Sequence, residues 1–387
     1  MKRMIAAITT SRADYNHLYW PLRAMTACDE IDLRIVAMGP HLSPEFGNTA
    51  SEMEKDGLRI DARVECLLSS DTDVGMAKTI GVATLGLADC LGQMRPDLML
   101  LIADRYEFLA PAAVGLALRI PMAHIEGGEI SEGAIDDTVR NALTKMCHVH
   151  FTSTTMARDR VIAIGEEAWR VHHTGAPSLD HLRKSRLLDR AELERRMNLD
   201  FSRPSALITC HPTTMLPDTI SEADSLFAAL DRLQLQCLFC YPNADAGSRA
   251  LIARAEAFVK AHDGARLFVN LPAVEYWSLL RETTVLIGNS SSGIMEAASF
   301  GIPAVNIGIR QRGREYGRNV LHAKSDADAI EKAVLRALDP AFRDSLQGMQ
   351  NPYGDGCASE KIVEVLRSVE LGQKLLIKKA PPLSRVS

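Results

Sequence analysis

Short apolar runs alternate with amphipathic stretches along most of the 387-residue chain, and this alternation constrains the fold more than any other feature. In the first half, strands are predicted over residues 4–9, 33–38, 98–103, 122–125 and 149–152. Helices are predicted between them, over residues 19–26, 74–95, 109–118, 136–145 and 155–164. Strands that alternate with helices indicate βαβ units and a parallel sheet.

The same alternation restarts in the second half of the chain. Strands are predicted over residues 206–209, 236–241, 266–269, 285–287 and 304–307. Helices are predicted over residues 191–197, 222–233, 250–261, 274–281, 294–298, 326–338 and 359–371. Gly175 and Pro177 interrupt the pattern between the halves. We therefore expect an α/β protein with two Rossmann-like domains, over residues 1–173 and 174–358, and a terminal helical segment over 359–379.

Charge and hydropathy exclude several classes of protein. Lys plus Arg number 44 and Asp plus Glu number 49, which gives a formal net charge of −5. A nucleic-acid-binding protein usually carries a basic face, so no nucleic-acid partner is expected. The longest uninterrupted apolar run, residues 108–118, contains Pro111 and Gly115 and is too short to cross a bilayer, so no membrane partner is expected.

The eight cysteines are scattered, and only Cys237 and Cys240 have CxxC spacing. That pair lies in an apolar run predicted to be a strand, and no second CxxC exists to complete a zinc site. Buried, reduced thiols are the favoured interpretation, and they indicate the cytoplasm.

Polar residues follow the predicted strands, where doubly wound domains bind ligands in a cleft. The turn 288–293 is a candidate anion site, since small residues let the backbone approach a phosphate and Ser290 and Ser291 add hydroxyl donors. An ordinary serine N-cap explains the same residues equally well. Glu296 could accept hydrogen bonds from a ribose diol, or it could merely complement the helix dipole. The guanidinium of Arg310 could pair with a phosphate.

Carboxylates gather after three strands of the first half: Asp104, Glu126, Glu129, Asp136 and Asp137. Each alone could be a cap or a surface charge, but several in one cleft would repel, which shifts pKa values and creates general acids and bases. His124 and Glu126 are two residues apart and are predicted to face the same side of a strand, whereas Asp136 and Arg140 can pair along a helix.

His211, after a second-half strand, could donate to a diphosphate or act as an acid, although a buried histidine is the simpler interpretation. Only their number suggests a set of metal ligands among four further histidines: His148, His150, His172 and His173. The chain has neither GxGxxG after a strand nor GxxxxGK[ST], which disfavours dinucleotide oxidoreductases and P-loop NTPases.

Taken together, these segments resemble the hydrolysing UDP-N-acetylglucosamine 2-epimerases. The resemblance is carried by residues 10–15 (TSRADY), 41–47 (HLSPEFG), 67–72 (LLSSDT), 104–107 (DRYE), 124–129 (HIEGGE), 135–137 (IDD) with Arg140, 288–291 (GNSS), 301–308 (GIPAVNIG) and 310–315 (RQRGRE). They occur in order over nearly the whole chain.

The resemblance implies the two-domain GT-B fold with the active site in the cleft, and a last helix that crosses back to the first domain. It also implies the first step of bacterial sialic-acid-type (nonulosonate) sugar synthesis. A nucleotide sugar would be eliminated to a 2-acetamidoglycal and nucleoside diphosphate, and hydration would give the free, C2-inverted sugar. This chemistry implies no cofactor and no metal, and the family likeness implies a homo-oligomer, either a dimer or a tetramer.

By matching motif positions, Asp104, Glu126, Asp136 and His211 resemble the family's catalytic residues. Nucleotide-contacting positions match Arg12, Ala13, Arg105, Asn243, Ser290, Ser291, Glu296 and Arg310. Which carboxylate serves as base and which as acid is left open by the sequence.

The substrate stays open between N-acetylglucosamine and N,N′-diacetylbacillosamine, and between UDP and GDP. The loop 129–135, one residue longer than in animal members, lies near the expected sugar site. Three alternatives remain: a non-hydrolysing 2-epimerase, a GT-B glycosyltransferase and an inactive nucleotide-sugar sensor.

Overall fold

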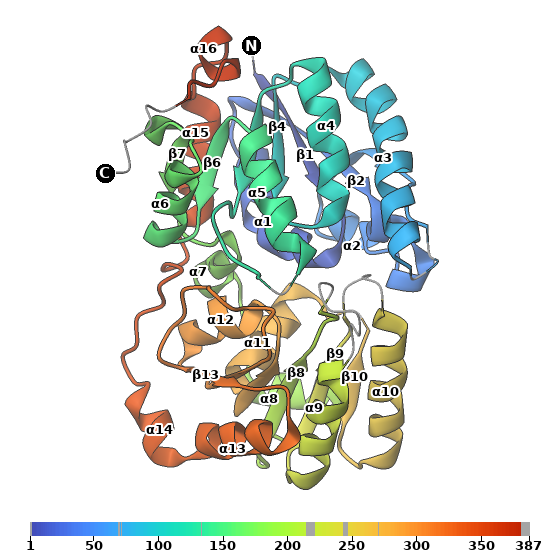
Figure 1. Ribbon diagram of the computed structural model, residues 1–387, viewed down its shortest axis with the longest axis vertical. Helices are drawn as coiled ribbons and strands as arrows, with labels where there is room; N and C mark the ends of the chain where they lie inside the picture. Colours follow the sequence, from blue (N-terminus) through green and yellow to red (C-terminus); the bar gives the residue numbers. More distant parts are fainter. Residues whose placement is uncertain are drawn as a thin grey trace, which may run out of the picture.

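The computed structural model describes residues 2–380, apart from 69, 71, 133, 214–220, 243–246 and 270. Two parallel sheets organise the chain into two halves that lie one above the other in Figure 1. The first sheet has the strand order β3-β2-β1-β4-β5-β6-β7, and the second has β10-β9-β8-β11-β12-β13. Both follow the order 3-2-1-4-5-6 of doubly wound folds, in which ligands bind beyond the carboxyl ends of the strands.

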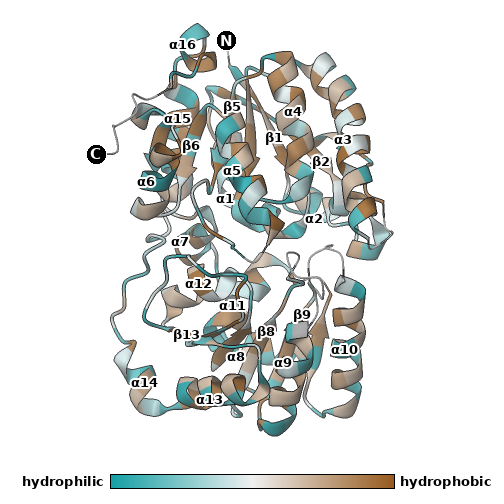
Figure 2. Cartoon of the chain, in the orientation of Figure 1, coloured by the Kyte–Doolittle hydropathy of each residue, from teal (hydrophilic) through white to brown (hydrophobic). Residues whose placement is uncertain are grey.

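The first half contains these strands and helices: β1 (Arg3–Thr9), α1 (Arg12–Thr26), β2 (Ile31–Met38), α2 (Ala50–Lys55), β3 (Ile60–Val64), α3 (Asp73–Met94), β4 (Leu98–Ile102), α4 (Leu109–Leu118), β5 (Met122–Ile125), α5 (Ile135–Met146), β6 (Val149–Thr152), α6 (Thr155–Ala163) and β7 (Val171–His173). Its central strands are largely hydrophobic, as Figure 2 shows in brown for β1, and β4 is apolar and buried at every position. A strand covered by helices on both faces needs such a run.

The second half contains α7 (His181–Lys184), α8 (Arg190–Met197), β8 (Ser205–Thr209), α9 (Ser221–Arg232), β9 (Gln236–Cys240), α10 (Ser248–Ala261), β10 (Arg266–Phe268), α11 (Ala273–Glu282), β11 (Val285–Gly288), α12 (Ser292–Met295), β12 (Ala304–Ile307), β13 (Val320–Ala323), α13 (Ala327–Leu338) and α14 (Pro340–Ser345). The predicted domain limits at residues 173 and 358 stay a prediction, and the two sheets lie on either side of the first limit.

The chain then returns to the first half. Helices α15 (Ala358–Ser368) and α16 (Gln373–Leu376) lie beside the N-terminal sheet in Figure 1. Ile362, Leu366 and Leu375 belong to the apolar core of that half. The side chain of Arg170 donates to the carbonyls of Lys374, Leu375 and Ile377, which fixes the end of the crossing segment.

Strands β3, β7 and β13 were missed by the sequence pattern, and all three are edge strands. An edge strand is half exposed and keeps polar residues, so it lacks the apolar run of a central strand. In β3, Asp61 and Arg63 stand between the buried Ile60 and Val64.

Helix α1 begins at Arg12 rather than at residue 19 as predicted. Ser11 and Asp14 form a capping box at its start, and Asp14 accepts from the backbone N–H of Thr10 and of Ser11. The first turns of α1 are polar because they face the cleft, so the apolar periodicity begins only later. The predicted helix therefore lacks this polar stretch.

One helix in the described part of the chain, α3, is long and apolar enough to cross a membrane by length and composition. Its best 18-residue window has a mean hydropathy of 1.3, and 28% of that window is buried. Lys78 and Asp89 interrupt the apolar sequence of α3, so it does not form one unbroken apolar run. Core helices of globular domains pass the same test, and one face of α3, including Ala83 and Leu87, packs into the N-terminal core.

Candidate active site

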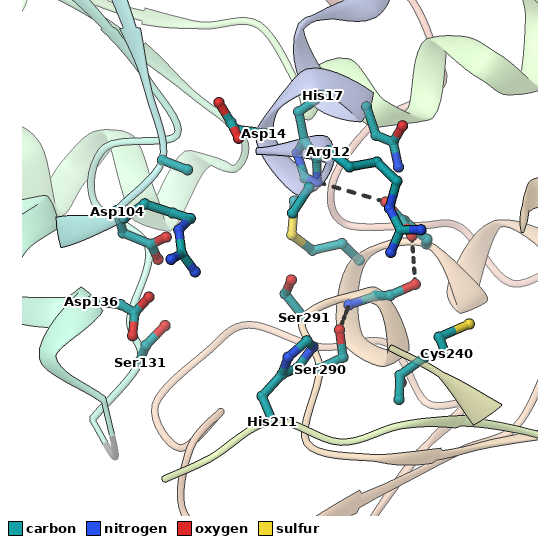
Figure 3. Close-up of a pocket in the computed structure, with 18 of the residues that line it drawn as sticks. Arg12, Asp14, His17, Asp104, Ser131, Asp136, His211, Cys240, Ser290 and Ser291 are labelled. Atoms are coloured by element: carbon teal, nitrogen blue, oxygen red, sulfur yellow. Dashed lines mark hydrogen bonds and ion pairs between the residues drawn. The ribbon is translucent and has the colours of Figure 1, made fainter. Parts of the chain in front are cut away.

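A cavity lies between the two halves and is lined by loops and by the first turns of helices that follow the strands of both sheets. The first half contributes Arg12, Ala13, Asp14, Asn16, His17, Ala103, Asp104, Arg105, Glu126, Ser131 and Asp136. The second half contributes Thr209, His211, Cys240, Tyr241, Leu271, Tyr276, Trp277, Ser290, Ser291, Ser292, Met295, Glu296, Arg310, Gln311 and Arg314. Figure 3 shows Asp104, Asp136 and Ser131 on one side and His211, Ser290 and Ser291 on the other.

The first wall is acidic. Asp104 follows β4 and is paired with the guanidinium of Arg140, a buried side chain of α5. Arg140 also donates to the carbonyl oxygen of Glu129 at 2.9 Å and lies 3.8 Å from Asp137. Asp136, in the first turn of α5, lines the cavity beside Ser131. The buried guanidinium of Arg140 thus connects the loop after β4, which carries Asp104, to the segment from Glu129 to Asp137.

Glu126 is buried and forms an ion pair with His17 of α1. The distance from His17 Nδ1 to Glu126 Oε1 is 2.7 Å, and His17 Nε2 lies 3.9 Å from Glu296 Oε1. Burial alone would lower the pKa of His17, but the charges of Glu126 and then Glu296 outweigh it and raise the pKa to about 9. Burial alone would raise the pKa of Glu126, but His17 lowers it. Glu126 is therefore a carboxylate at neutral pH, next to a protonated imidazole.

His17 joins the two halves of the molecule at this point. It belongs to the first half, as does Glu126, whereas Glu296 follows α12 of the second half. The Nε2 edge of the imidazole therefore faces a carboxylate from across the cleft.

The prediction that His124 and Glu126 face the same side is wrong. Strand β5 ends at Ile125, and Glu126 has a φ of +65°, so the alternation of an extended strand does not continue to it. His124 is fully buried, contacts the carbonyl oxygen of Ala103 at 2.8 Å and is not among the lining residues. Burial lowers the pKa of His124 to about 4, which keeps it neutral.

The opposite wall is built around the turn after β11. Gly288 has a φ of +145°, and a Cβ there would lie 2.0 Å from the carbonyl oxygen of Thr209, so only glycine lets β11 and β8 approach this closely. Ser290 and Ser291 follow in the turn and line the cavity. Helix α12 has only four residues, so its dipole adds less attraction for an anion than the sequence suggested.

Asn289 organises the polar side chains of this wall. Its carbonyl oxygen accepts from Arg310 at 3.2 Å and from Gln311 at 2.9 Å. Its side chain receives the backbone N–H of His211 and donates to the carbonyl oxygen of His211, both at 2.8 Å. The positions of His211 and Arg310 are thereby linked through one buried residue.

Two further arginines approach from the first half. Arg12 donates to the carbonyl oxygen of Val269, across the cleft, at 3.2 Å. Arg105 is buried and forms an ion pair with the fully buried Glu107 at 2.9 Å.

Arg314 adds a cation that the sequence analysis did not select. It lines the cavity, donates to the carbonyl oxygen of Ile130 at 2.8 Å and lies 3.8 Å from Glu129. Glu129 is not among the lining residues; it accepts from the hydroxyl of Tyr353 at 3.1 Å, and burial raises its pKa.

The residues predicted to be catalytic or to contact the nucleotide all line this cavity except Asn243, which lies outside the described residues. Glu129 and Asp137 of the predicted carboxylate cluster do not line it. Apart from Arg314, the side chains of His17, Tyr276 and Ser131 line the cavity without having been predicted from the sequence. His17 could have been found, because a helix begun at Arg12 places it one turn after Ala13, on the same face. Among the described residues, no group of three or more His, Cys, Asp or Glu side chains is placed to hold a metal ion.

The family model described as UDP-N-acetylglucosamine 2-epimerase matches residues 23–367. The chain belongs to this family. The epimerase named UDP-N,N'-diacetylbacillosamine 2-epimerase (hydrolyzing), from Legionella pneumophila, is 34% identical over 379 residues, which cover 98% of this chain and 99% of that protein. The Campylobacter jejuni GDP/UDP-N,N'-diacetylbacillosamine 2-epimerase (hydrolyzing) is 33% identical over 374 residues, with 96% and 97% coverage.

Among solved structures, the UDP-GlcNAc 2-epimerase from Neisseria meningitidis bound to UDP-GlcNAc has the same fold. Its TM-score is 0.78, with 16% identity over 94% of this chain and 99% of that chain. The GT-B-like arrangement of two parallel-sheet domains is thereby confirmed. Membership of the family supports nucleotide-sugar 2-epimerase activity.

Proposed function

We propose that this epimerase is hydrolysing: it splits a UDP-linked 2-acetamido sugar into UDP and a free sugar inverted at C2. The observation that carries the proposal is the cavity with two unlike walls. One presents Asp104, Glu126 and Asp136, and the other presents His211, Ser290, Ser291, Arg310 and Arg314. A diphosphate on the cationic wall would bring the sugar to the carboxylates.

The proposed chemistry has two steps. In the first, a carboxylate takes the proton from C2, the C2–H electron pair forms the C1=C2 double bond, and the C1–O pair leaves with the diphosphate. In the second, the oxygen of a water molecule adds to C1, its surplus proton is removed, and a proton is delivered to C2 from the opposite face. Because C2–H is weakly acidic, C1–O cleavage runs ahead and positive charge develops on the ring, which carboxylates stabilise.

On the leaving-group side, Arg310, Arg12 and the serine hydroxyls are proposed to bind the diphosphate, and His211 to donate to it. Charge-assisted hydrogen bonds stabilise the UDP that departs more than the intact substrate, because negative charge accumulates on it. Glu296 is proposed to accept from the ribose diol. Arg105, Ala13 and Asn243 stay proposed nucleotide contacts.

On the sugar side, Glu126 and Asp104 differ in their partners. Glu126 is ionised beside protonated His17, so we assign it the stabilisation of positive charge on the ring. Asp104 and Asp136 are then the proposed proton-transfer groups. His17 is a positioning residue in this scheme, acting through Glu126.

For the sugar, we favour N,N′-diacetylbacillosamine linked to UDP. This preference is supported by the near full-length similarity to the Legionella and Campylobacter proteins, which are named as N,N'-diacetylbacillosamine 2-epimerases. A free manno-configured sugar of this type would supply nonulosonate synthesis, and the eight free cysteines support a reducing, cytoplasmic location.

Proton NMR in D₂O tests this function, with UDP-N,N′-diacetylbacillosamine and UDP-N-acetylglucosamine in separate samples. We expect free UDP and a manno-configured reducing sugar with deuterium at C2, formed faster from the first substrate. A UDP-linked epimer without UDP release would instead assign a non-hydrolysing epimerase. UDP release that requires an added sugar acceptor would assign a glycosyltransferase, and binding without any turnover would assign a sensor.

A further inference from the structure

Gln311 and Arg314 line the active-site cavity but have no assigned contact with the substrate. Both belong to the loop between β12 and β13, and the backbone N–H of Arg314 donates to the carbonyl oxygen of Gln311 at 3.4 Å. Gln311 is 2% exposed and Arg314 7%. Any polar atom that these side chains leave unbonded therefore lies in the interior of the molecule, at the wall of the cavity.

The amide group of Gln311 is bonded at its nitrogen and unbonded at its oxygen. Its Nε2 donates to the carbonyl oxygen of Asn289 at 2.9 Å, the same oxygen that accepts from Arg310. Its Oε1 is buried and accepts no hydrogen bond from any described residue. A buried acceptor without a donor costs free energy, so this oxygen is suited to a ligand that brings an N–H or O–H group.

The guanidinium of Arg314 offers the opposite chemistry. Its Nε donates to the carbonyl oxygen of Ile130 at 2.8 Å and lies 3.8 Å from Glu129 Oε2. Its Nη1 lies 3.4 Å from the thioether sulfur of Met295, and a thioether is a weak acceptor. Its Nη2 has no hydrogen-bond partner in the described part of the chain. The guanidinium is thus fixed at one edge and keeps N–H donors for a ligand at the other.

Met295 adds an apolar surface to these two polar groups. It is the last residue of α12, is 2% exposed and lines the same cavity. An acetamido group has an N–H donor, a carbonyl acceptor and a methyl group. Gln311 Oε1 can accept from the N–H, Arg314 can donate to the carbonyl oxygen, and Met295 can contact the methyl group. A hydroxyl group would leave the methyl contact unmade and would offer one oxygen to both polar partners.

The position of these three residues along the cavity selects one substituent of the sugar. Gln311 is bonded to the same carbonyl oxygen as Arg310, which is proposed to bind the diphosphate. Arg314 bonds Ile130, whose neighbour Ser131 lines the acidic side of the cavity in Figure 3. They therefore lie between the diphosphate end and the acidic wall, where C1 and C2 of the sugar are expected. The substituent at C2 adjoins C1, whereas the substituent at C4 lies across the ring.

We propose that Gln311, Arg314 and Met295 bind the 2-acetamido group of the sugar and make the protein select it over a sugar with a hydroxyl group at C2. This inference rests on the proposed function, because the diphosphate and the carboxylates set the direction of the sugar in the cavity. Binding the acetamido group fixes the rotation of the ring about the C1–O bond. The C2 hydrogen is thereby presented to the carboxylate that removes it.

The first test measures affinity without turnover. In the Asp104→Asn background, calorimetry measures the dissociation constants of UDP-N-acetylglucosamine and UDP-glucose. We expect the acetamido compound to bind at least about tenfold more tightly, since the compound without the amide leaves buried polar groups unpaired. Adding Arg314→Met or Gln311→Met should reduce this preference to less than about threefold, because each removes one polar partner and keeps a side chain of similar length. No preference in the background protein, or an unchanged preference in both variants, would overturn the proposal.

Arg312→Met is the matched control for both substitutions. Arg312 belongs to the same loop but is exposed and is not among the residues that line the active-site cavity, so this variant should keep the preference. The affinity for UDP alone should stay within about threefold of the background value in all three variants, because Arg310 keeps its own bond to Asn289. If UDP affinity fell in step with the preference, Gln311 and Arg314 would act through the diphosphate site, and the direct contact would be overturned.

A second comparison separates the substituent at C2 from the substituent at C4. UDP-N,N′-diacetylbacillosamine and the same compound with a free amino group at C4 both keep the 2-acetamido group. We expect Arg314→Met and Gln311→Met to weaken the binding of both compounds by factors that agree within about threefold. A loss confined to the diacetylated compound would assign the residues to the C4 group and overturn the proposal.

The two kinds of measurement distinguish this inference from the proposed function. If the wild type released no UDP while the preference for the acetamido compound was lost in the Arg314 and Gln311 variants, hydrolysis would be wrong and the acetamido contact would be supported. If the wild type released UDP and Arg314→Met kept kcat/KM for the acetamido substrate within about threefold, hydrolysis would be supported and the contact would be wrong. The thermal midpoint of each variant reports whether the fold is intact.

Discussion

His17 shows how one residue can set the properties of a catalytic cavity. It lies between Glu126 of its own half and Glu296 of the other, and its pKa is raised to about 9. Other titratable groups that interact with the pair are Asp14 on α1, Glu129, His124 on β5, His181 on α7 and Arg314 across the cleft.

We expect His17→Asn to lower kcat by about 10- to 100-fold and to change the pH profile. Without the imidazolium, burial raises the pKa of Glu126, so the acid limb of kcat/KM moves to higher pH. The alkaline limb near pH 9, where His17 loses its proton, should disappear. His17→Lys keeps a cation and should retain more activity than the asparagine variant. An unchanged profile in both variants would contradict the role of His17.

The same pair couples stability to pH. The pKa of His17 is raised from 6.5 to about 9 on folding, so its contribution is fully present below pH 6.5 and is lost as pH rises through 9. We expect thermal midpoints of the wild type and His17→Asn to converge above pH 9, measured by calorimetry. If the two thermal midpoints still differed at pH 10, the variant would be destabilised mainly by lost packing and not by the lost charge.

The carboxylates and the cations of the cavity should separate turnover from binding. Asp104→Asn and Glu126→Gln should lower kcat by at least about 100-fold while the dissociation constant of UDP changes by less than about threefold. Arg310→Ala should instead weaken UDP binding by about tenfold or more, since it removes a charge-assisted contact. Calorimetric titration measures the dissociation constant of UDP for each of the three variants, and a turnover assay measures kcat. If the Asp104 variant lost UDP affinity in step with turnover, its assignment to the sugar side would be wrong.

At the scale of elements, the turn after β11 depends on Gly288. Gly288→Ala should destabilise the protein by about 3 kcal/mol or more, because it adds strain at positive φ to a contact of 2.0 Å with Thr209. Gly372→Ala is the matched control, because Gly372 has the same φ of +145° but open space where a Cβ would lie. Urea unfolding should show a larger loss of unfolding free energy for Gly288→Ala than for Gly372→Ala. Equal losses would mean that backbone strain alone, and not the contact with Thr209, destabilises Gly288→Ala.

Elements also show which parts of the fold can be predicted from sequence. Helix α4 was predicted with its observed bounds, and the central strands were all found, because burial on both faces demands an unbroken apolar run. The edge strands β3, β7 and β13 were not found, since they need no such run. The start of α1 was missed although its capping residues, Ser11 and Asp14, were visible.

At the scale of the whole molecule, the crossing helix α15 stabilises the first half. Ile362→Ala on α15 should cost about 2 to 5 kcal/mol, because Ile362 is fully buried in the N-terminal core. Hydrogen exchange should show the loss of protection in β1 and α1. Ile330→Ala, also fully buried but in α13, should instead expose β12 and β13. The same exchange pattern in both variants would contradict two separate cores joined by a crossing helix.

The sequence by itself determined the two parallel sheets, the family and the residues that gather in the cavity, because buried strands need apolar runs and the groups follow the strands directly. Only the tertiary structure decided which groups meet. Contacts between segments far apart in the chain pair Arg140 with Asp104 and place His17 between Glu126 and Glu296. They also bury His124. Their charges and pKa values follow from those contacts and from burial, neither of which is a property of a residue and its neighbours in sequence.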